Sequence, residues 1–255
     1  MYPVKGFTRK CRFAIVVALM ALSSSEAMAQ KIDTIAVLPF QSHGAFQDTA
    51  IWRFGFPEAL ASHLAKVPGI TIVDRVQLSL VLQEMSLGQS GVISSETAMK
   101  VGSVIGARFL ITGAVYRIDR AVRMVIQLIE ISTSKLTASA AVSEAYARPG
   151  DYFIVEAKGI REFFRHLAKL NPSFAMQPPA FESDENSLAA FSQFSQALEN
   201  LDNGNPQAAQ RLMEMAIRSD SRFYKAKILR TRVQEAFDEL ERAAQKFEES
   251  KVRKP

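Results

Sequence analysis

The sequence predicts a mixed α/β fold, a partly antiparallel sheet with helices, followed by a small all-α helical-hairpin tail. Three observations lead to this prediction. A short, fully apolar run at residues 35–38 is typical of a strand that is covered on both faces. This strand is followed by a helix pattern, a second short strand and two further helix patterns. Three long strands then follow in succession. The expected order is β-α-β-α-α-β-β-β-α.

The first 29 residues are expected to be a signal peptide. Four basic residues precede the apolar run from Phe13 to Leu22, and Ala27-Met28-Ala29 has the small-x-small form that signal peptidase recognises. Cleavage is expected after Ala29, which would release the chain into the periplasm. A membrane-spanning helix needs about twenty apolar residues, and this run is roughly half as long. An uncleaved anchor is the alternative.

The charge and cysteine content exclude several classes of protein. After Ala29 the chain keeps 27 Lys and Arg against 25 Asp and Glu, a net charge of +2, so a basic nucleic-acid surface is not expected. The single cysteine, Cys11, precedes the apolar run, whereas a lipid-bearing cysteine would follow it. An exported chain without disulfides fits a bacterial periplasm, where a large core replaces them.

The first half of the chain gives two strands and three helices. The strand at 35–38 ends at Pro39, and a helix follows whose regular part starts near Pro57. Its apolar stripe consists of Phe56, Leu60, Leu64 and Val67. A second strand covers 70–75, where Asp74 is placed to cap the next helix. In the third helix, Ala98, Gly102 and Gly106 recur every fourth residue and predict close packing onto the sheet.

The second half gives three strands, a long helix and a tail. The strands are "RFLITGAVY", "VRMVIQLIEI" and "KLTASAAVSEAY", and a helix at about 149–170 follows them. Its buried candidates are Phe153, Ile160, Phe163, Phe164 and Leu167. Residues 171–186 contain three prolines and predict a linker. Residues 187–250 predict two helices broken at 203–206 and a final charged helix, in which Ala226, Val233, Leu240 and Phe247 give a weak coiled-coil signal. Packing against the helical pair is the favoured interpretation.

Three blocks resemble a known family. "IAVLPF", "GITIVDRVQLSLVLQE" and "KVGSVIGARFLITGAV" are similar to the CsgG/HfaB family of curli-type secretion proteins and to the related periplasmic domain of TolB-like and FlgO-like proteins. The resemblance spans Ile35 to Leu170, within an α/β domain expected at 30–170. It implies an exported, non-enzymatic protein that acts as an accessory or scaffold in envelope assembly or secretion.

The tail resembles a single tetratricopeptide repeat. The residues that carry this resemblance are Gly204, Ala209, Met213 and Ala216, whereas Ser221 and Ala197 depart from the repeat's usual proline and glycine. One repeat cannot form a solenoid. The tail is therefore expected to be a capping or docking helical pair that binds envelope protein partners.

A ring-forming outer-membrane channel subunit is the alternative function. The resemblance implies that such channels insert two β-hairpins per subunit, and a membrane strand needs about nine to eleven residues. Only five residues separate Tyr116 from Val122, and the strands also carry Arg123, Gln127 and Glu130. The hairpin is therefore expected to belong to the sheet, with no direct membrane span. Attachment to the outer membrane through another protein stays open.

No catalytic, cofactor-binding or metal-binding residues are predicted. "GQSGV" at Gly88–Val92 lacks the second glycine of a nucleophile elbow, and His43, His63 and His166 lack the short spacing of a metal site. Asp74 and Arg75 are explained by helix capping and a surface ion pair. The protein is not expected to be an enzyme, and an unrecognised hydrolase is the second alternative.

Four aromatic residues form the candidate interface: Phe46, Trp52, Phe54 and Phe56. Aromatic side chains often anchor protein interfaces, but the same residues suit the face of a sheet. Both interpretations stay open at this point, and so does a homo-oligomer.

Overall fold

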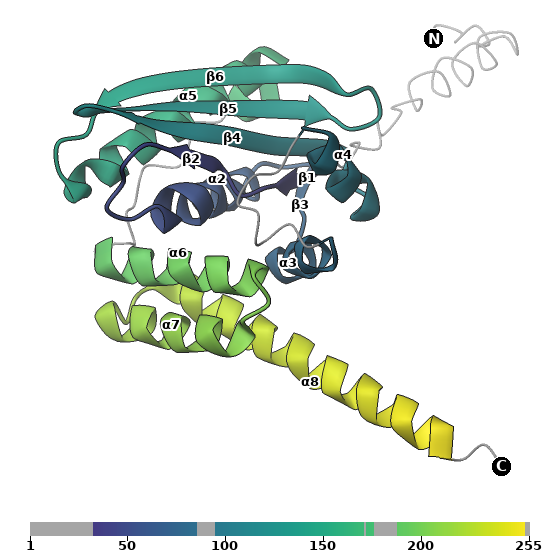
Figure 1. The fold of residues 1–255 in the computed structure, drawn as a ribbon. Coiled ribbons are helices and arrows are strands. Elements are labelled where there is room, and N and C mark those ends of the chain that lie inside the picture. Colours follow the sequence, from purple (N-terminus) through teal and green to yellow (C-terminus); the bar gives the residue numbers. More distant parts are fainter. Residues whose placement is uncertain (1–32, 86–94, 171, 176–187, 253–255) are drawn as a thin grey trace, which may run out of the picture. The chain divides into compact units, whose positions relative to one another are not determined.

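The computed structural model describes residues 33–85, 95–170, 172–175 and 188–252 (Figure 1). From Asp33 onward the chain forms one compact unit by its contacts. The expected signal peptide lies outside the described residues. So does the "GQSGV" segment at Gly88–Val92, together with most of the predicted linker.

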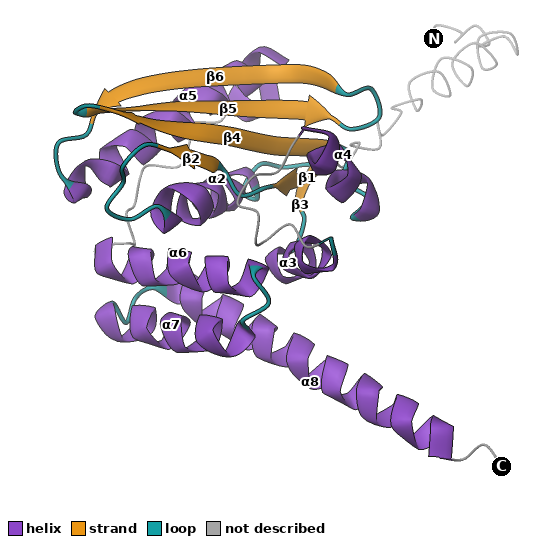
Figure 2. Ribbon diagram, viewed as in Figure 1, coloured by secondary structure: helices purple, strands orange, loops and turns teal. Residues whose placement is uncertain are grey.

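A six-stranded mixed sheet is the framework of the fold (Figure 2). Its strands are β1 (Asp33–Val37), β2 (Gln41–His43), β3 (Ile70–Ile72), β4 (Phe109–Ile118), β5 (Ala121–Glu130) and β6 (Lys135–Ala145). The order across the sheet is β3-β1-β4-β5-β6, and β2 pairs with β4. The predicted α/β fold and the order of its long elements are confirmed. The sequence did not predict β2, because three polar residues after a proline show no alternation.

Helices cover the sheet and form the tail. They are a π-helical turn η1 (Ile51–Gly55), α2 (Phe56–Leu64), α3 (Arg75–Glu84), α4 (Ser95–Val104), α5 (Tyr152–Leu170), α6 (Leu188–Asp202), α7 (Pro206–Ser219) and α8 (Tyr224–Val252), with short 3-10 turns η2 (Pro149–Asp151) and η3 (Pro172–Ala175). No helix in the described ranges is both long and apolar enough to cross a membrane.

The strand β1 is buried on both faces, as its apolar run predicts. Ile35 and Val37 join the large core cluster that contains α2 and α5. Ala36 and Leu38 join a second cluster with α3 and α4. Because successive side chains of a strand point to opposite faces, one strand supplies both clusters.

The hairpin of β4 and β5 lies within the sheet over its whole length. Pairing runs from Phe109 opposite Glu130 to Ile118 opposite Ala121. The turn between the strands is Asp119-Arg120, and Asp119 has a positive φ of 51°. Asp tolerates this left-handed conformation better than most residues, which suits it to a tight turn.

The helix α4 approaches the sheet closely at one glycine. A Cβ atom on Gly102 would lie 2.4 Å from Cδ1 of Ile131, so a larger residue would require the Ile131 side chain to move. Ala98 is buried as well, which agrees with the predicted close packing. The prediction for Gly106 is wrong, because α4 ends at Val104 and Gly106 follows the helix. Its φ is positive at 67°, and a Cβ atom placed on it would meet no atom within 4 Å. Its role is conformational.

The caps and core positions of the other helices follow the sequence pattern. Asp74 caps α3, since its carboxylate accepts hydrogen bonds from the backbone N–H groups of Val76 and Gln77. The predicted core residues of α5 are buried, except that Phe153 is only partly covered. The 3-10 turn η3, inside the predicted linker, packs Phe174 edge-on against Phe164 of α5.

The tail consists of α6, α7 and α8. The first two helices are joined through Gly204, whose φ of 74° requires glycine, and this is the predicted break. Ala226 and Val233 of α8 are buried. The side chains of Leu240 and Phe247 lie outside the described residues, so the coiled-coil signal stays a prediction.

Candidate functional site at the contact between the sheet and the helical tail

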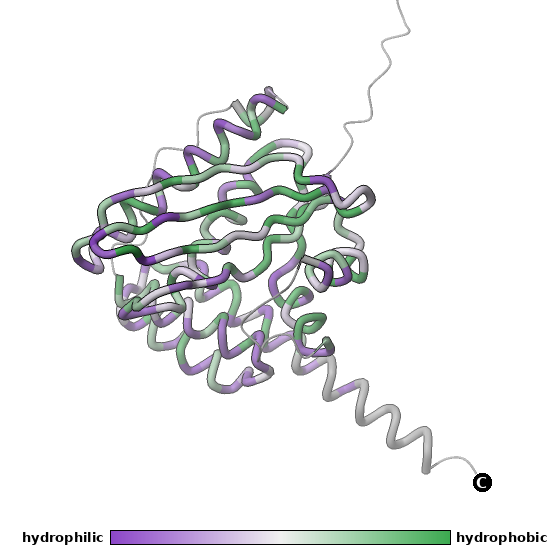
Figure 3. Tube along the Cα trace, turned by 45° about the horizontal axis from the view of Figure 1, so that its top comes forward, coloured by the Kyte–Doolittle hydropathy of each residue, from purple (hydrophilic) through white to green (hydrophobic). Residues whose placement is uncertain are grey.

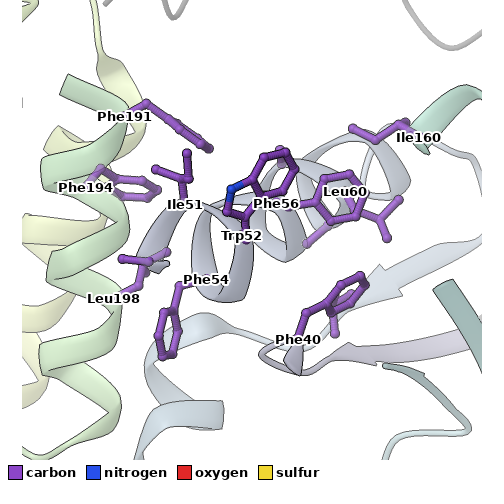
Figure 4. Packing of buried hydrophobic residues seen from close by; sticks show 14 of the residues in the cluster. Phe40, Ile51, Trp52, Phe54, Phe56, Leu60, Ile160, Phe191, Phe194 and Leu198 are labelled. Carbon is purple, nitrogen blue, oxygen red and sulfur yellow. The ribbon is translucent and has the colours of Figure 1, made fainter. Parts of the chain in front are cut away.

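The helical tail (188–252) packs directly on the α/β part (33–170), and an aromatic patch forms the centre of this contact. Ile51, Trp52 and Phe54 project from η1, and Phe191, Phe194 and Leu198 come from α6 (Figure 4). The ring of Trp52 lies 4.8 Å from that of Tyr152, which lies 5.1 Å from Phe191. Edge-on and tilted ring pairs of this kind are favourable beyond the apolar area they bury.

A glycine allows α6 to approach η1. A Cβ atom on Gly55 would lie 2.4 Å from Oγ of Ser195 and 2.7 Å from the ring of Phe191. Any larger residue would therefore push the tail away from the α/β part. π-helical turns such as η1 insert an extra residue into a helix and are frequent at functional sites.

The structure places all four candidate interface residues at or near this contact. Trp52, Phe54 and Phe56 are buried, and Phe46 is partly buried against Trp52, with ring centres 5.5 Å apart. Trp52 and Phe54 belong to the patch that faces α6, whereas Phe56 packs against Phe40, with ring centres 5.4 Å apart. A role for these four residues in binding another protein stays a prediction.

A group of charged side chains forms the other half of the contact. Arg75 of α3 places Nη2 2.8 Å from Oδ1 of Asp202, the last residue of α6. Ser79 donates a hydrogen bond of 2.6 Å to the same oxygen and accepts one of 2.9 Å from Nη1 of Arg75. Asp202 is 2% exposed and the Arg75 side chain 12%, so this ion pair is largely shielded from water.

Glu58 of α2 completes the charged group. Its carboxylate lies 4.0 Å from Nε of Arg75. Burial raises the pKa of Glu58, against the attraction of Arg75 and Lys225. Burial by itself would lower the pKa of Arg75, but the charge and hydrogen bond of Asp202, with Glu58, raise it above its ordinary value. Arg75 is therefore charged under all physiological conditions.

Hydrogen bonds and ion pairs at the margin extend the contact. Gln83 of α3 donates a bond of 2.6 Å to the carbonyl of Leu201. Asp74 pairs with Arg232 of α8 at 2.6 Å, and Arg53 pairs with Glu199 of α6 at 3.2 Å. These links connect η1 and α3 with α6 and α8.

A pocket of about 540 Å³ opens beside the charged group. Ile70–Arg75, from β3 to the start of α3, line it, and so do Ala61 of α2 and Ala65, which directly follows that helix. Glu58 and Arg232 also line it, so its walls combine apolar surface with both signs of charge.

The charged group is suited to holding two elements together rather than to catalysis. Ser79 is fully buried and donates to Asp202, so its hydroxyl cannot reach a substrate. Burial lowers the pKa of His63 to about 4, with a further contribution from Lys66 and Lys225. Over the part of the chain that the structure describes, there is no cluster of three acidic, histidine or cysteine side chains that could hold a metal ion.

Sequence reasoning missed the pairing of Arg75 with Asp202. It explained Asp74 and Arg75 by capping and a surface ion pair; the cap is observed, but the exposed ion pair joins Asp74 to Arg232, and Arg75 turns inward. One signal was present. Asp202 ends a helix, where the macrodipole disfavours an acidic residue, so a nearby cation was to be expected.

Comparison with known proteins identifies the α/β part. The family described as curli production assembly/transport component CsgG matches residues 23–125. Residues 23–125 of this chain are thus similar to the CsgG family. The match covers β1 to β4 and the first half of β5, and it leaves β6, α5 and the tail outside. No curated protein matches the chain.

Solved structures show only distant likenesses to this chain. The LpoB C-terminal domain from Escherichia coli is 17% identical, covers 50% of this chain and 93% of its own, and has a TM-score of 0.37. The PelC dodecamer from Paraburkholderia phytofirmans is 17% identical over 54% of this chain and 89% of its own, with a TM-score of 0.33. Lipoprotein GNA1162 from Neisseria meningitidis is 15% identical over 49% and 91%, with a TM-score of 0.34. These likenesses are too remote to support a function.

Proposed function

We propose that this chain is an exported, non-enzymatic scaffold or accessory protein in envelope assembly or secretion, of the curli production and transport class. It acts in the periplasm, and its tail, a tetratricopeptide-like helical pair extended by α8, binds protein partners. The observation that carries the proposal is that an α/β part similar to the CsgG family and a helical tail share one buried contact. A tail held in a fixed position on the α/β part suits a scaffold, because its binding surface is then presented at a fixed place.

The side of the tail that faces solvent offers a surface for a partner. Tyr224 and Ile228 are 45% and 49% exposed and lie four residues apart on α8, so they share one side of the helix. Met215 of α7 is 47% exposed. Exposed aromatic, aliphatic and methionine side chains on helices are typical of surfaces that receive a partner segment.

The burial of the residues that carry the tetratricopeptide resemblance supports the proposal that the tail is a tetratricopeptide-like helical pair. Ala209, Met213 and Ala216 are fully buried between the tail helices, as small and large core residues of such a repeat would be. The repeat assignment itself remains part of the proposal.

Fractionation of cells tests the scaffold role against a channel. We expect a high-salt wash to release the protein from membranes as a soluble species without detergent. Recovery only after detergent extraction, as a heat-resistant oligomer in the outer-membrane fraction, would contradict the scaffold role.

A cross-linking experiment in cells tests the role of the tail. We expect the double substitution Tyr224→Ser with Ile228→Ser to abolish defined cross-linked adducts with envelope proteins. The matched control is Val104→Ser, which changes an apolar side chain that is 64% exposed on the α/β part. Equal adduct formation by the double variant and wild type would show that the tail is not the docking surface.

A further inference from the structure

The strand β6 forms one edge of the sheet, beyond β5 (Figure 1). It is 11 residues long and pairs antiparallel with β5 on one side. The helix α5 packs on one face of it, through links such as the ion pair of Lys158 with Glu144 at 2.6 Å. No described strand pairs with its other side.

The backbone groups on the outer side of β6 can be assigned from one hydrogen bond. The N–H of Tyr146 donates to the carbonyl of Arg120 at 2.7 Å. Because hydrogen-bonded and non-bonded pairs alternate in an antiparallel ladder, the even-numbered residues from 138 to 144 bond to β5. The N–H and C=O groups of Ser139, Ala141, Ser143 and Ala145 therefore point outward. No partner for them occurs among the described residues.

Between Ala138 and Ser143 this edge lacks the features by which proteins usually prevent strand pairing, since its one register shift lies at Leu136–Ala138 and its charged residues at the two ends. Edge strands are commonly kept short, or they carry proline or charged residues. β3, at the opposite edge, has three residues and leads directly into α3. β6 has no proline, and Leu136–Ser143 contains no charge. Its pale colours in Figure 3 reflect a run of alanine, serine and threonine, near the middle of the hydropathy scale.

We propose that β6 pairs antiparallel with β6 of a second copy of this chain, across a two-fold axis at Ala141. The sheet then continues from one copy into the other, and the symmetry closes at a dimer. The outward N–H and C=O groups of Ala141 bond to those of Ala141 in the second copy. Ser139 then lies opposite Ser143 of the second copy. This inference concerns self-association and does not depend on the proposed scaffold role.

The charges of β6 favour this occupant and this direction. Lys135 and Glu144 lie near opposite ends of the strand. Antiparallel self-pairing brings the basic end of one copy to the acidic end of the other. In the stated register Glu144, which pairs with Lys158 of its own chain, lies opposite Ala138. No like charges face each other, whereas a parallel arrangement would bring like ends together.

Dimerisation would also bury part of the exposed apolar side chain of Leu136. Leu136 is 55% exposed and lies on the sheet face opposite α5, as its pairing with Ile129 shows. In the dimer it lies beside Ala145 of the second copy, which is exposed on the same face of the sheet.

Analytical ultracentrifugation of the mature chain tests the proposal through an unused backbone group. We expect a concentration-dependent dimer for wild type and a monomer for Ala141→Pro, because proline removes an outward N–H and leaves the ladder to β5 intact. Ala141→Lys is a second variant with the same expected result. The matched control is Gln127→Lys, in the middle of the same sheet face, which should still dimerise. Circular dichroism checks that each variant is folded.

Cysteine cross-linking tests the register. Cys11 is the only cysteine and lies in the expected signal peptide, so introduced cysteines stand alone. Residues opposite each other across the axis have Cα atoms about 5.5 Å apart, within disulfide range. We expect Ala141→Cys to cross-link to itself, and Ser139→Cys to cross-link mainly with Ser143→Cys in a mixture. A monomer at all concentrations, or a dimer that Ala141→Pro leaves unchanged, would overturn the proposal.

Discussion

The two halves of the contact between the α/β part and the tail are built on opposite principles. One half is aromatic and apolar, with Trp52 fully buried against Tyr152 of α5, whose ring in turn contacts Phe191 of α6. The other half is charged, with Arg75 between Asp202 and Glu58. Oδ2 of Asp202 has no hydrogen-bond partner among the described residues, so desolvation is not fully offset there.

The difference separates attachment from orientation. Burial of apolar surface contributes favourable free energy whatever the angle at which helices meet. A buried ion pair contributes little net stability, but it strongly disfavours arrangements in which either charge is unpaired. The aromatic half therefore holds the tail to the α/β part, and the charged half selects one orientation of α6 on α3.

The largest effect is expected from loss of the central aromatic side chain. Trp52→Ala should lower the free energy of unfolding by about 3–5 kcal/mol, because it leaves a cavity among Phe46, Tyr146 and Tyr152. Urea unfolding followed by circular dichroism measures this. Ile154→Ala, at a side chain 54% exposed on α5, is the control and should change stability little. A similar small loss for both variants would show that Trp52 contributes little to the stability of this cluster.

Breaking the ion pair should cost slightly less, and its repair should be informative. Asp202→Ala leaves Arg75 buried without its main partner, so we expect a loss of about 3 kcal/mol. The double variant Arg75→Met with Asp202→Leu should recover most of that loss. If the double variant is no more stable than Asp202→Ala, the two side chains are not energetically coupled.

The dependence of stability on pH tests the burial of His63 on α2. Its pKa is lowered to about 4 by burial, whereas the unfolded chain takes up the proton near the ordinary value of 6.5. The stabilising effect of neutral His63 is therefore complete above pH 6.5 and is lost as pH falls toward 4. The loss amounts to at most about 3 kcal/mol. Unfolding of wild type and His63→Gln across this range should show a difference that changes with pH. Parallel profiles would contradict the assignment.

The smallest effect is expected at a single hydrogen bond. Gln83→Ala removes the bond to the carbonyl of Leu201 and should lower stability by about 1 kcal/mol. Gln77→Ala, at an exposed position on the same helix, is the matched control. Equal stability of the two variants would mean that this bond contributes nothing to the contact.

The sequence predicted the elements because their signals are local. A doubly buried β1, the cap at Asp74 and the break at Gly204 each follow from residues within a few positions. The contact between tail and sheet could not be predicted in this way. Arg75 and Asp202 are far apart in sequence, and no periodicity records which helix lies opposite which.

Two glycines show the same limit at the level of single residues. Gly102 and Gly106 fit one helical pattern, but only Gly102 packs against the sheet, while Gly106 lies beyond the end of α4. The aromatic cluster near Trp52 was recognised as either core or interface. Trp52 and Phe56 are fully buried, and a one-dimensional pattern does not show which elements cover them.

Hydrogen exchange across a urea series tests the central claim most directly, namely that the tail and the α/β part unfold as one cooperative structure. Amides of α6 and of the β4–β5 hairpin should then show the same free energy of opening and the same dependence on urea. Exchange of α6 through a separate opening of lower free energy, while β4 and β5 stay protected, would contradict the account.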